Sequence, residues 1–139
     1  MYSEEIISLV KERVSKFEEI IAVYLFGSFL SSEEYEDIDI GILLDDTFEP
    51  NYMYEIKIQR ILEKLLRAKL DVHKTVDIHI LNHQNVRFLY GILGNSKLIL
   101  SKNETKRAKF EARVITHYLD MKPFYEYFDN MRRLRYGHR

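Results

Sequence analysis

Cysteine is missing from this sequence of 139 residues, and proline and glycine are scarce, with two and five copies. The absence of cysteine excludes disulfide bonds, thiolate catalysis and cysteine-ligated zinc, so a bound metal must use oxygen or imidazole ligands. Long apolar runs are also lacking, because the longest, at 20–26 and 38–44, are far too short to cross a bilayer. The first residues, MYSEEIISLVKERV, are acidic and amphipathic and do not resemble a secretion signal. We therefore expect a cytoplasmic protein without membrane association.

Neither sign of charge dominates, because 21 Lys and Arg residues stand against 22 Asp and Glu residues, for a formal net charge of −1. Proteins that bind nucleic acid usually carry a basic surface, so direct DNA binding is not expected. The local exception is the segment 131–139, which contains no acid and carries Arg132, Arg133, Arg135, His138 and Arg139. This tail could bind an acidic partner or phosphates, although a solvated helix end is the commoner reason for such a run.

What is present describes one compact domain over 1–139, since 46% of the residues are hydrophobic and 31% are charged. Short apolar runs rich in branched residues predict strands at 20–26, 37–44, 76–81 and 97–100. Apolar residues at helical spacing predict helices at 3–17, 54–70 and 86–93, and a helical segment from 103 that breaks or kinks at Pro123. The fold class is therefore α/β (α+β), with an α/β core at 1–101 and C-terminal helices at 102–139.

Apolar and aromatic residues concentrate late in the chain, beyond the predicted break: Phe124, Tyr125, Tyr127, Phe128 and Met131. They could cover the domain's own core or contact another protein. We expect the first role, because exposed aromatic patches are uncommon on monomers.

Asp37 and Asp39 stand two residues apart on a predicted strand, so both carboxylates leave one face while Ile38 and Ile40 pack behind them. Like charges this close are costly without a cation, and an all-oxygen site favours Mg²⁺ or Mn²⁺ over zinc. Asp77 faces outward on a later predicted strand and can join the pair if the two strands are neighbours. Three carboxylates can hold two metal ions, one of which binds a triphosphate while the other activates the attacking hydroxyl. If a protein group acts as the general base, we expect it to be Asp77.

Gly27 and Ser28 end the predicted strand at 20–26 and fit the same site. A strand that ends in glycine lets the backbone approach a phosphate closely, and the next turn can present amides and the serine hydroxyl. Each of these signals is common by chance, and acidic residues at strand ends are often only solvated. Their order predicts a catalytic nucleotide site: a strand, Gly-Ser, a spacer of eight residues, Asp-Ile-Asp on a strand and an Asp on a later strand.

Other polar residues are left outside this site. His79 shares its predicted strand face with Asp77, and we expect it to lie behind the metal ligands or to be a neutral surface histidine. Asp45 and Asp46 are expected to end a strand and begin a turn. The cations Lys102, Lys106, Arg107 and Lys109 could neutralise phosphates, but a solvated helix face explains them equally well.

The segments VYLFGSFLSSEEYEDIDIGILL and VDIHIL resemble the DNA polymerase β-type nucleotidyltransferase superfamily, specifically the minimal nucleotidyltransferase (MNT) antitoxins paired with HEPN toxins. The tail KRAKFEARVITHYLDMKPFYEYF is similar to the C-terminal helices of those antitoxins. The resemblance implies a nucleotidyltransferase fold with a mixed sheet and flanking helices. It also implies Mg²⁺, ATP as donor, and transfer of AMP to a tyrosine of a cognate HEPN toxin.

In that resemblance Gly27 and Ser28 match the phosphate-binding pair, Asp37 and Asp39 the metal aspartates, and Asp77 the third carboxylate. The chain would then assemble with the toxin or with itself. Two alternatives stay open: transfer of a nucleotide to a small molecule, which usually needs an added domain, and an antitoxin that acts by binding alone. The three aspartates argue against the second, because placing them together without cations would cost several kcal/mol.

Overall fold

The computed structural model describes residues 2–137, in which four strands form one sheet with the order β3-β2-β1-β4. The strands are β1 (Ile20–Phe26), β2 (Asp37–Leu44), β3 (Thr75–Ile80) and β4 (Lys97–Ser101). Strand β1 pairs antiparallel with β2 and β4, whereas β2 and β3 are parallel, which confirms the mixed sheet. Helix α3 (Tyr54–Leu70) supplies the crossover that a parallel pair requires.

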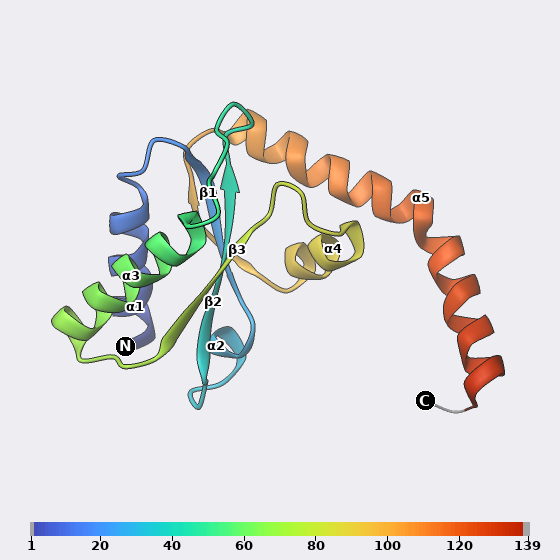
Figure 1. The fold of residues 1–139 in the computed structure, drawn as a ribbon, viewed down its shortest axis with the longest axis horizontal. Coiled ribbons are helices and arrows are strands. Elements are labelled where there is room, and N and C mark those ends of the chain that lie inside the picture. The colour runs from blue at the N-terminus through green and yellow to red at the C-terminus, as the bar shows by residue number, and fades with distance from the viewer. Residues whose placement is uncertain (1, 138–139) are drawn as a thin grey trace.

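The helices cover the two faces of the sheet unequally. Helix α1 (Tyr2–Val14) and helix α3 lie on one face, while α4 (Val86–Gly94) and the start of α5 (Glu104–Tyr136) lie on the other (Figure 1). The first face buries the larger core, which includes Ile38, Ile40 and Val76. On the second face Tyr24, Leu89 and Phe110 belong to a smaller cluster.

Local sequence signals account for several of these boundaries. Asn85 caps α4 by accepting hydrogen bonds from the amides of Arg87 and Phe88, and Asn103 caps α5 through the amide of Lys106. Asp45 begins the predicted turn after β2, where its carboxylate accepts from the Thr47 amide. A fifth helix, α2 (Ser28–Ser31), was not predicted, because four residues are too few to show a helical period.

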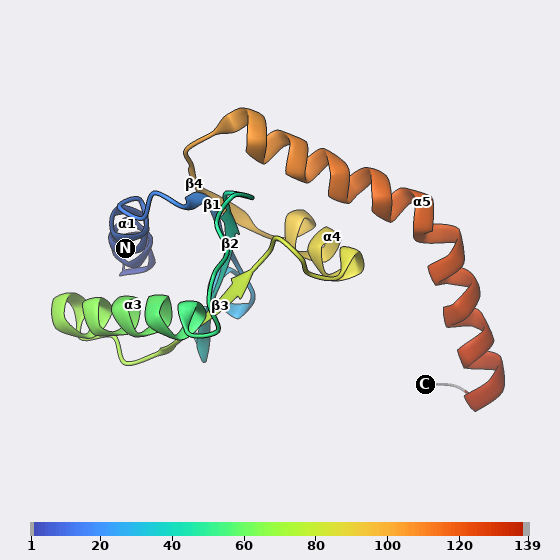
Figure 2. The ribbon, with the colours of Figure 1, turned by 45° about the horizontal axis from the view of Figure 1, so that its top comes forward.

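Helix α5 is continuous for 33 residues, with Pro123 inside it. Both ribbon views show it bending part way along, so the predicted interruption is a kink and not a break (Figures 1 and 2). Its first half packs on the sheet, where Phe110 and Val114 are buried. Among residues 2–137, no helix is long and apolar enough to span a membrane.

The expectation that the late aromatic residues cover the core is wrong. Phe124, Tyr127 and Phe128 are 55%, 58% and 59% exposed, because the second half of α5 extends away from the sheet. Three arginines of the basic tail lie at the end of this helix, and His138 and Arg139 lie outside the described residues.

Candidate active site

Two of the predicted carboxylates lie side by side because of the strand register. In the parallel pair of β2 and β3, Asp39 lies opposite Asp77 and Ile38 opposite Val76. Since Ile38 and Val76 belong to the core beneath α1 and α3, the alternating aspartates project from the opposite face of the sheet. Oxygens of Asp39 and Asp77 and a nitrogen of His79 all lie within 4.8 Å of one another.

Asp37 stands at the exposed start of β2, opposite Thr75. It is not part of the tight group formed by Asp39, Asp77 and His79. Its negative charge still reaches the group, since it contributes to raising the pKa of Asp39.

Asp39 is the most shielded carboxylate of the three, with a side chain that is 23% exposed. Burial is the main cause that raises its pKa above the usual value, and the charges of Asp77 and Asp37 act in the same direction. Contact with His79 opposes these effects. A divalent cation would stabilise the charged form of Asp39 and can take oxygen ligands from its acidic neighbours, so the residues present fit Mg²⁺ or Mn²⁺.

Gly27 closes the site at the end of β1, next to Asp39. The antiparallel register sets Phe26 opposite Asp39, so the residue after the strand lies against that carboxylate. A Cβ atom added to Gly27 would lie 2.2 Å from Asp39 Oδ2, where no side chain fits. The next residue, Ser28, is exposed and begins α2.

His79 lies beside two of the predicted carboxylates, in agreement with the first of the two positions expected for it. Its Nε2 lies 3.2 Å from Asp77 Oδ2 and 3.5 Å from Asp39 Oδ1, although neither approach has the geometry of a hydrogen bond. The imidazole also packs against the rings of Phe26 and Phe88, with centroids 5.2 and 5.9 Å away. It is therefore a half-buried neighbour of both carboxylates and not a surface histidine.

An apolar hollow of about 280 Å³ adjoins Gly27, between the end of β1 and helix α4. The side chains that line it include Phe26, Phe88 and Arg87. This hollow could not be predicted from the sequence, because Phe88 and Arg87 come from a helix whose position against β1 is defined only in the folded chain.

A mixed sheet with paired aspartates on neighbouring strands and a Gly-Ser turn at the adjoining strand end defines the nucleotidyltransferase class. The family model "Polymerase beta, Nucleotidyltransferase" matches residues 5–105. The chain belongs to this family. No curated protein sequence matches the chain.

Solved structures of similar fold come from toxin–antitoxin complexes. One is the tri-AMPylated HEPN toxin of Shewanella oneidensis in complex with MNT antitoxin, with a TM-score of 0.65, 18% identity, and coverage of 89% of this chain and 96% of that chain. Another is a toxin–antitoxin with AMP-PNP, with a TM-score of 0.67, 18% identity, and coverage of 91% and 95%. The MntA-HepT toxin–antitoxin matches with a TM-score of 0.63, 18% identity, and coverage of 93% and 94%. At such identities the likeness shows a common fold, which confirms the predicted fold class.

Proposed function

We propose that the chain is a metal-dependent protein adenylyltransferase that transfers AMP from ATP to a tyrosine of a HEPN toxin and thereby acts as its antitoxin. The observation that carries the proposal is the register that sets Asp39 beside Asp77 on the open face of the sheet. The nucleotidyltransferase family and the similarity in fold to MNT antitoxins support it.

Each residue has a defined part in this proposal. Asp37, Asp39 and Asp77 would hold Mg²⁺, which when bound neutralises triphosphate charge and favours displacement at the α-phosphorus. Gly27 and Ser28 would border the phosphates, because the first backbone N–H groups of a helix lack intrahelical acceptors and the glycine leaves room for close approach. His79, behind Asp39 and Asp77, would keep their side chains in place.

The transfer itself forms one bond and breaks one. The tyrosine oxygen bonds to the α-phosphorus of ATP, and the bond from that phosphorus to the departing pyrophosphate oxygen breaks. The hydroxyl proton passes to Asp77 or to solvent, so the products are adenylylated tyrosine, pyrophosphate and a proton. The apolar hollow between Phe26 and Phe88 offers a surface for the ring of the adenine or of the acceptor tyrosine.

The test is the intact mass of a HEPN protein from the same genome after incubation with this chain and Mg²⁺-ATP. We expect a gain of one or more AMP units and a loss of at least ~100-fold in rate with Asp39→Asn. Asp46→Asn, which changes an exposed acid just beyond β2, is the control and should behave as the wild type. A stable complex without any mass gain would support the alternative of an antitoxin that acts by binding.

A further inference from the structure

We propose that the second half of helix α5, residues 119–136, is the surface on which the acceptor protein docks. We call this segment the arm. The inference rests on the proposed function, since the occupant is the protein that receives the nucleotide. It adds where that protein binds and which surface chemistry it must present.

The arm exposes more apolar surface than a free helix normally keeps in water. Seven of its large hydrophobic side chains are between 46% and 81% exposed: Leu119, Phe124, Tyr127, Phe128, Met131, Leu134 and Tyr136. Positions 124, 127, 128, 131 and 134 recur at intervals of three and four, so these side chains share one face of the helix. Aromatic residues and methionine are also the types enriched in the centres of protein interfaces.

The arm as a whole is nearly balanced, with three acids and four bases, but its C-terminal end is basic and indicates a partner with acidic groups at that end. The segment 131–137 holds three arginines and no acid. Arg132 pairs with Asp129 at 2.7 Å, whereas Arg133 and Arg135 have no carboxylate within ion-pair distance among residues 2–137. A hollow of about 420 Å³ on the same helix combines Tyr127, Met131 and Arg135. The complementary surface has apolar side chains at its centre and carboxylates at its edge.

Contacts with α4 fix the arm relative to the active site. Arg87 Nη2 lies 2.5 Å from Asp129 Oδ2, and the same guanidinium lies 4.9 Å from the ring centre of Tyr125. Tyr118 stacks on Tyr90 of α4 with centroids 3.8 Å apart. Helix α4 also contributes Phe88, which contacts His79, so one helix adjoins both the site and the arm.

The arm lies on the same side of the sheet as Asp39 and Asp77. Both ribbon views show α5 beyond α4, on the side of the sheet opposite α1 and α3 (Figures 1 and 2). Asp39 and Asp77 project from that same face. A protein held on the arm therefore lies on the side of the sheet where the nucleotide would be attacked.

The experiment measures three quantities for each variant: affinity for the HEPN protein, affinity for Mg²⁺-AMP-PNP, and the rate of AMP transfer at increasing HEPN concentration. The first variant combines Tyr127→Ser, Phe128→Ser and Met131→Ser, and the second combines Arg133→Glu and Arg135→Glu. The control combines Ile56→Ser and Leu98→Ser, which are each 38% exposed on α3 and β4.

We expect both arm variants to bind the HEPN protein about tenfold or more weakly, with unchanged nucleotide affinity and a transfer rate that recovers at high HEPN concentration. Unchanged HEPN affinity in both variants overturns the proposal. So does a wild-type dimer that the first variant converts to monomers at unchanged HEPN affinity, because the occupant is then a second copy.

The result also separates the arm from the enzyme. If the wild type and both arm variants transfer AMP at the same rate at low HEPN concentration, the arm is not the docking surface, but the proposed function stands. If the HEPN protein binds through the arm but no AMP is transferred, the docking surface is supported and the proposed function is contradicted. A wild type that neither binds nor modifies the HEPN protein contradicts both.

Discussion

At Gly27 the backbone has φ 81° and ψ −163°, a combination that essentially only glycine adopts. The same residue leaves the space that the Asp39 carboxylate occupies. Backbone conformation and side-chain contact therefore demand glycine independently. This explains how a strand can end directly against the carboxylate of Asp39.

Replacing Gly27 by alanine should damage both stability and function. The new methyl group must displace the Asp39 carboxylate and strain the backbone, so we expect unfolding to become easier by about 1–3 kcal/mol. AMP transfer should fall with it, since Asp39 can no longer meet Asp77. Urea denaturation and the HEPN mass assay measure the two effects.

Gly94→Ala is the matched control, because a Cβ atom there would meet nothing within 4 Å and its φ is not positive. That variant should keep wild-type activity and gain up to ~1 kcal/mol from improved helix propensity. Equal activity of Gly27→Ala and Gly94→Ala would show that the contact with Gly27 does not hold the Asp39 carboxylate in place.

At the residue scale, the site could be predicted where acidic residues follow the two-residue period of a strand. The alternation in Asp37-Ile38-Asp39 predicted which side chains share a face, and the register of β2 and β3 sets Asp77 opposite Asp39. Which of its two expected positions His79 takes could not be predicted, because that depends on packing against Phe26 and Phe88 from other elements. The assignment of Asp37, Asp39 and Asp77 as metal ligands stays a prediction.

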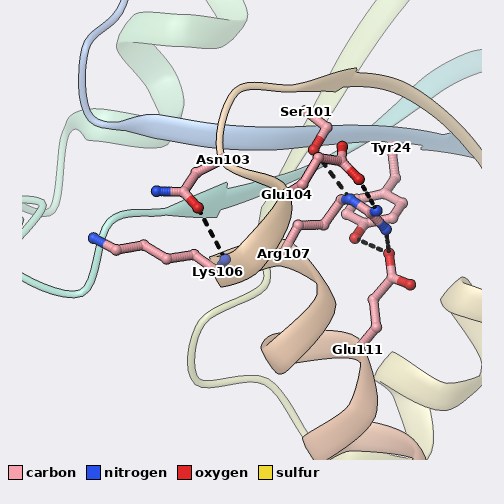
Figure 3. A network of polar contacts seen from close by, with 7 residues as sticks. All are labelled: Tyr24, Ser101, Asn103, Glu104, Lys106, Arg107 and Glu111. Carbon is pink, nitrogen blue, oxygen red and sulfur yellow. Dashed lines mark hydrogen bonds and ion pairs between the residues drawn. The ribbon is translucent and has the colours of Figure 1, made fainter.

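At the scale of elements, a polar network holds the start of α5 on the sheet. The hydroxyl of Tyr24 on β1 donates to Glu111 of α5 at 2.6 Å, and Arg107 donates to the same carboxylate at 2.8 Å (Figure 3). Arg107 also donates to the Ser101 hydroxyl at the end of β4. Arg107 is thus a structural residue and not part of a solvated face, and the arm extends from an anchored base.

Tyr24→Phe should therefore loosen α5 without creating a cavity. Tyr24 is 2% exposed, and its hydroxyl is the group that the substitution removes from Glu111. We expect the free energy of unfolding to fall by about 1.5–3 kcal/mol, the usual contribution of a hydrogen bond to a charged group. Urea denaturation followed by circular dichroism measures the change.

Tyr52→Phe serves as the reference, since Tyr52 is 90% exposed and should tolerate the change within ~0.5 kcal/mol. If both substitutions have the same effect, the Tyr24 hydroxyl does not anchor α5.

The elements themselves were largely predictable, because strands and helices differ in the period of their apolar residues. The four strands and the helices at 54–70 and 86–93 follow that period. The role of the late aromatic residues did not follow from it. A periodic apolar stripe shows that a helix has a face to bury, but it does not show whether the same chain covers that face.

At the scale of the molecule, the chain has two parts with different exposure. The α/β domain buries its apolar residues on both faces of the sheet, whereas the arm leaves its own exposed. The contacts between Arg87 and Asp129 and between Tyr90 and Tyr118 join the two parts. If the arm holds the acceptor, these contacts also determine how the acceptor faces the site.

Removing the charge of Asp129 tests this link. Because the chain has no cysteine, one introduced at each of the exposed positions Ser8 and Asn130 allows spin labels to report the distance from α1 to the arm. In Asp129→Asn we expect a broader distance distribution, since Arg87 and Arg132 both lose their carboxylate. The free energy of unfolding should change by less than ~1 kcal/mol, as is usual for exposed ion pairs.

Asp120→Asn, on the same helix, changes an exposed carboxylate that has no ion pair among the described residues and should leave the distribution as in the wild type. A broadened distribution in Asp129→Asn, with slower AMP transfer at unchanged AMP-PNP affinity, would show that arm orientation controls delivery of the acceptor. If the distribution stays narrow, the stack of Tyr118 on Tyr90 holds the arm without the ion pair, and the charge of Asp129 serves another purpose.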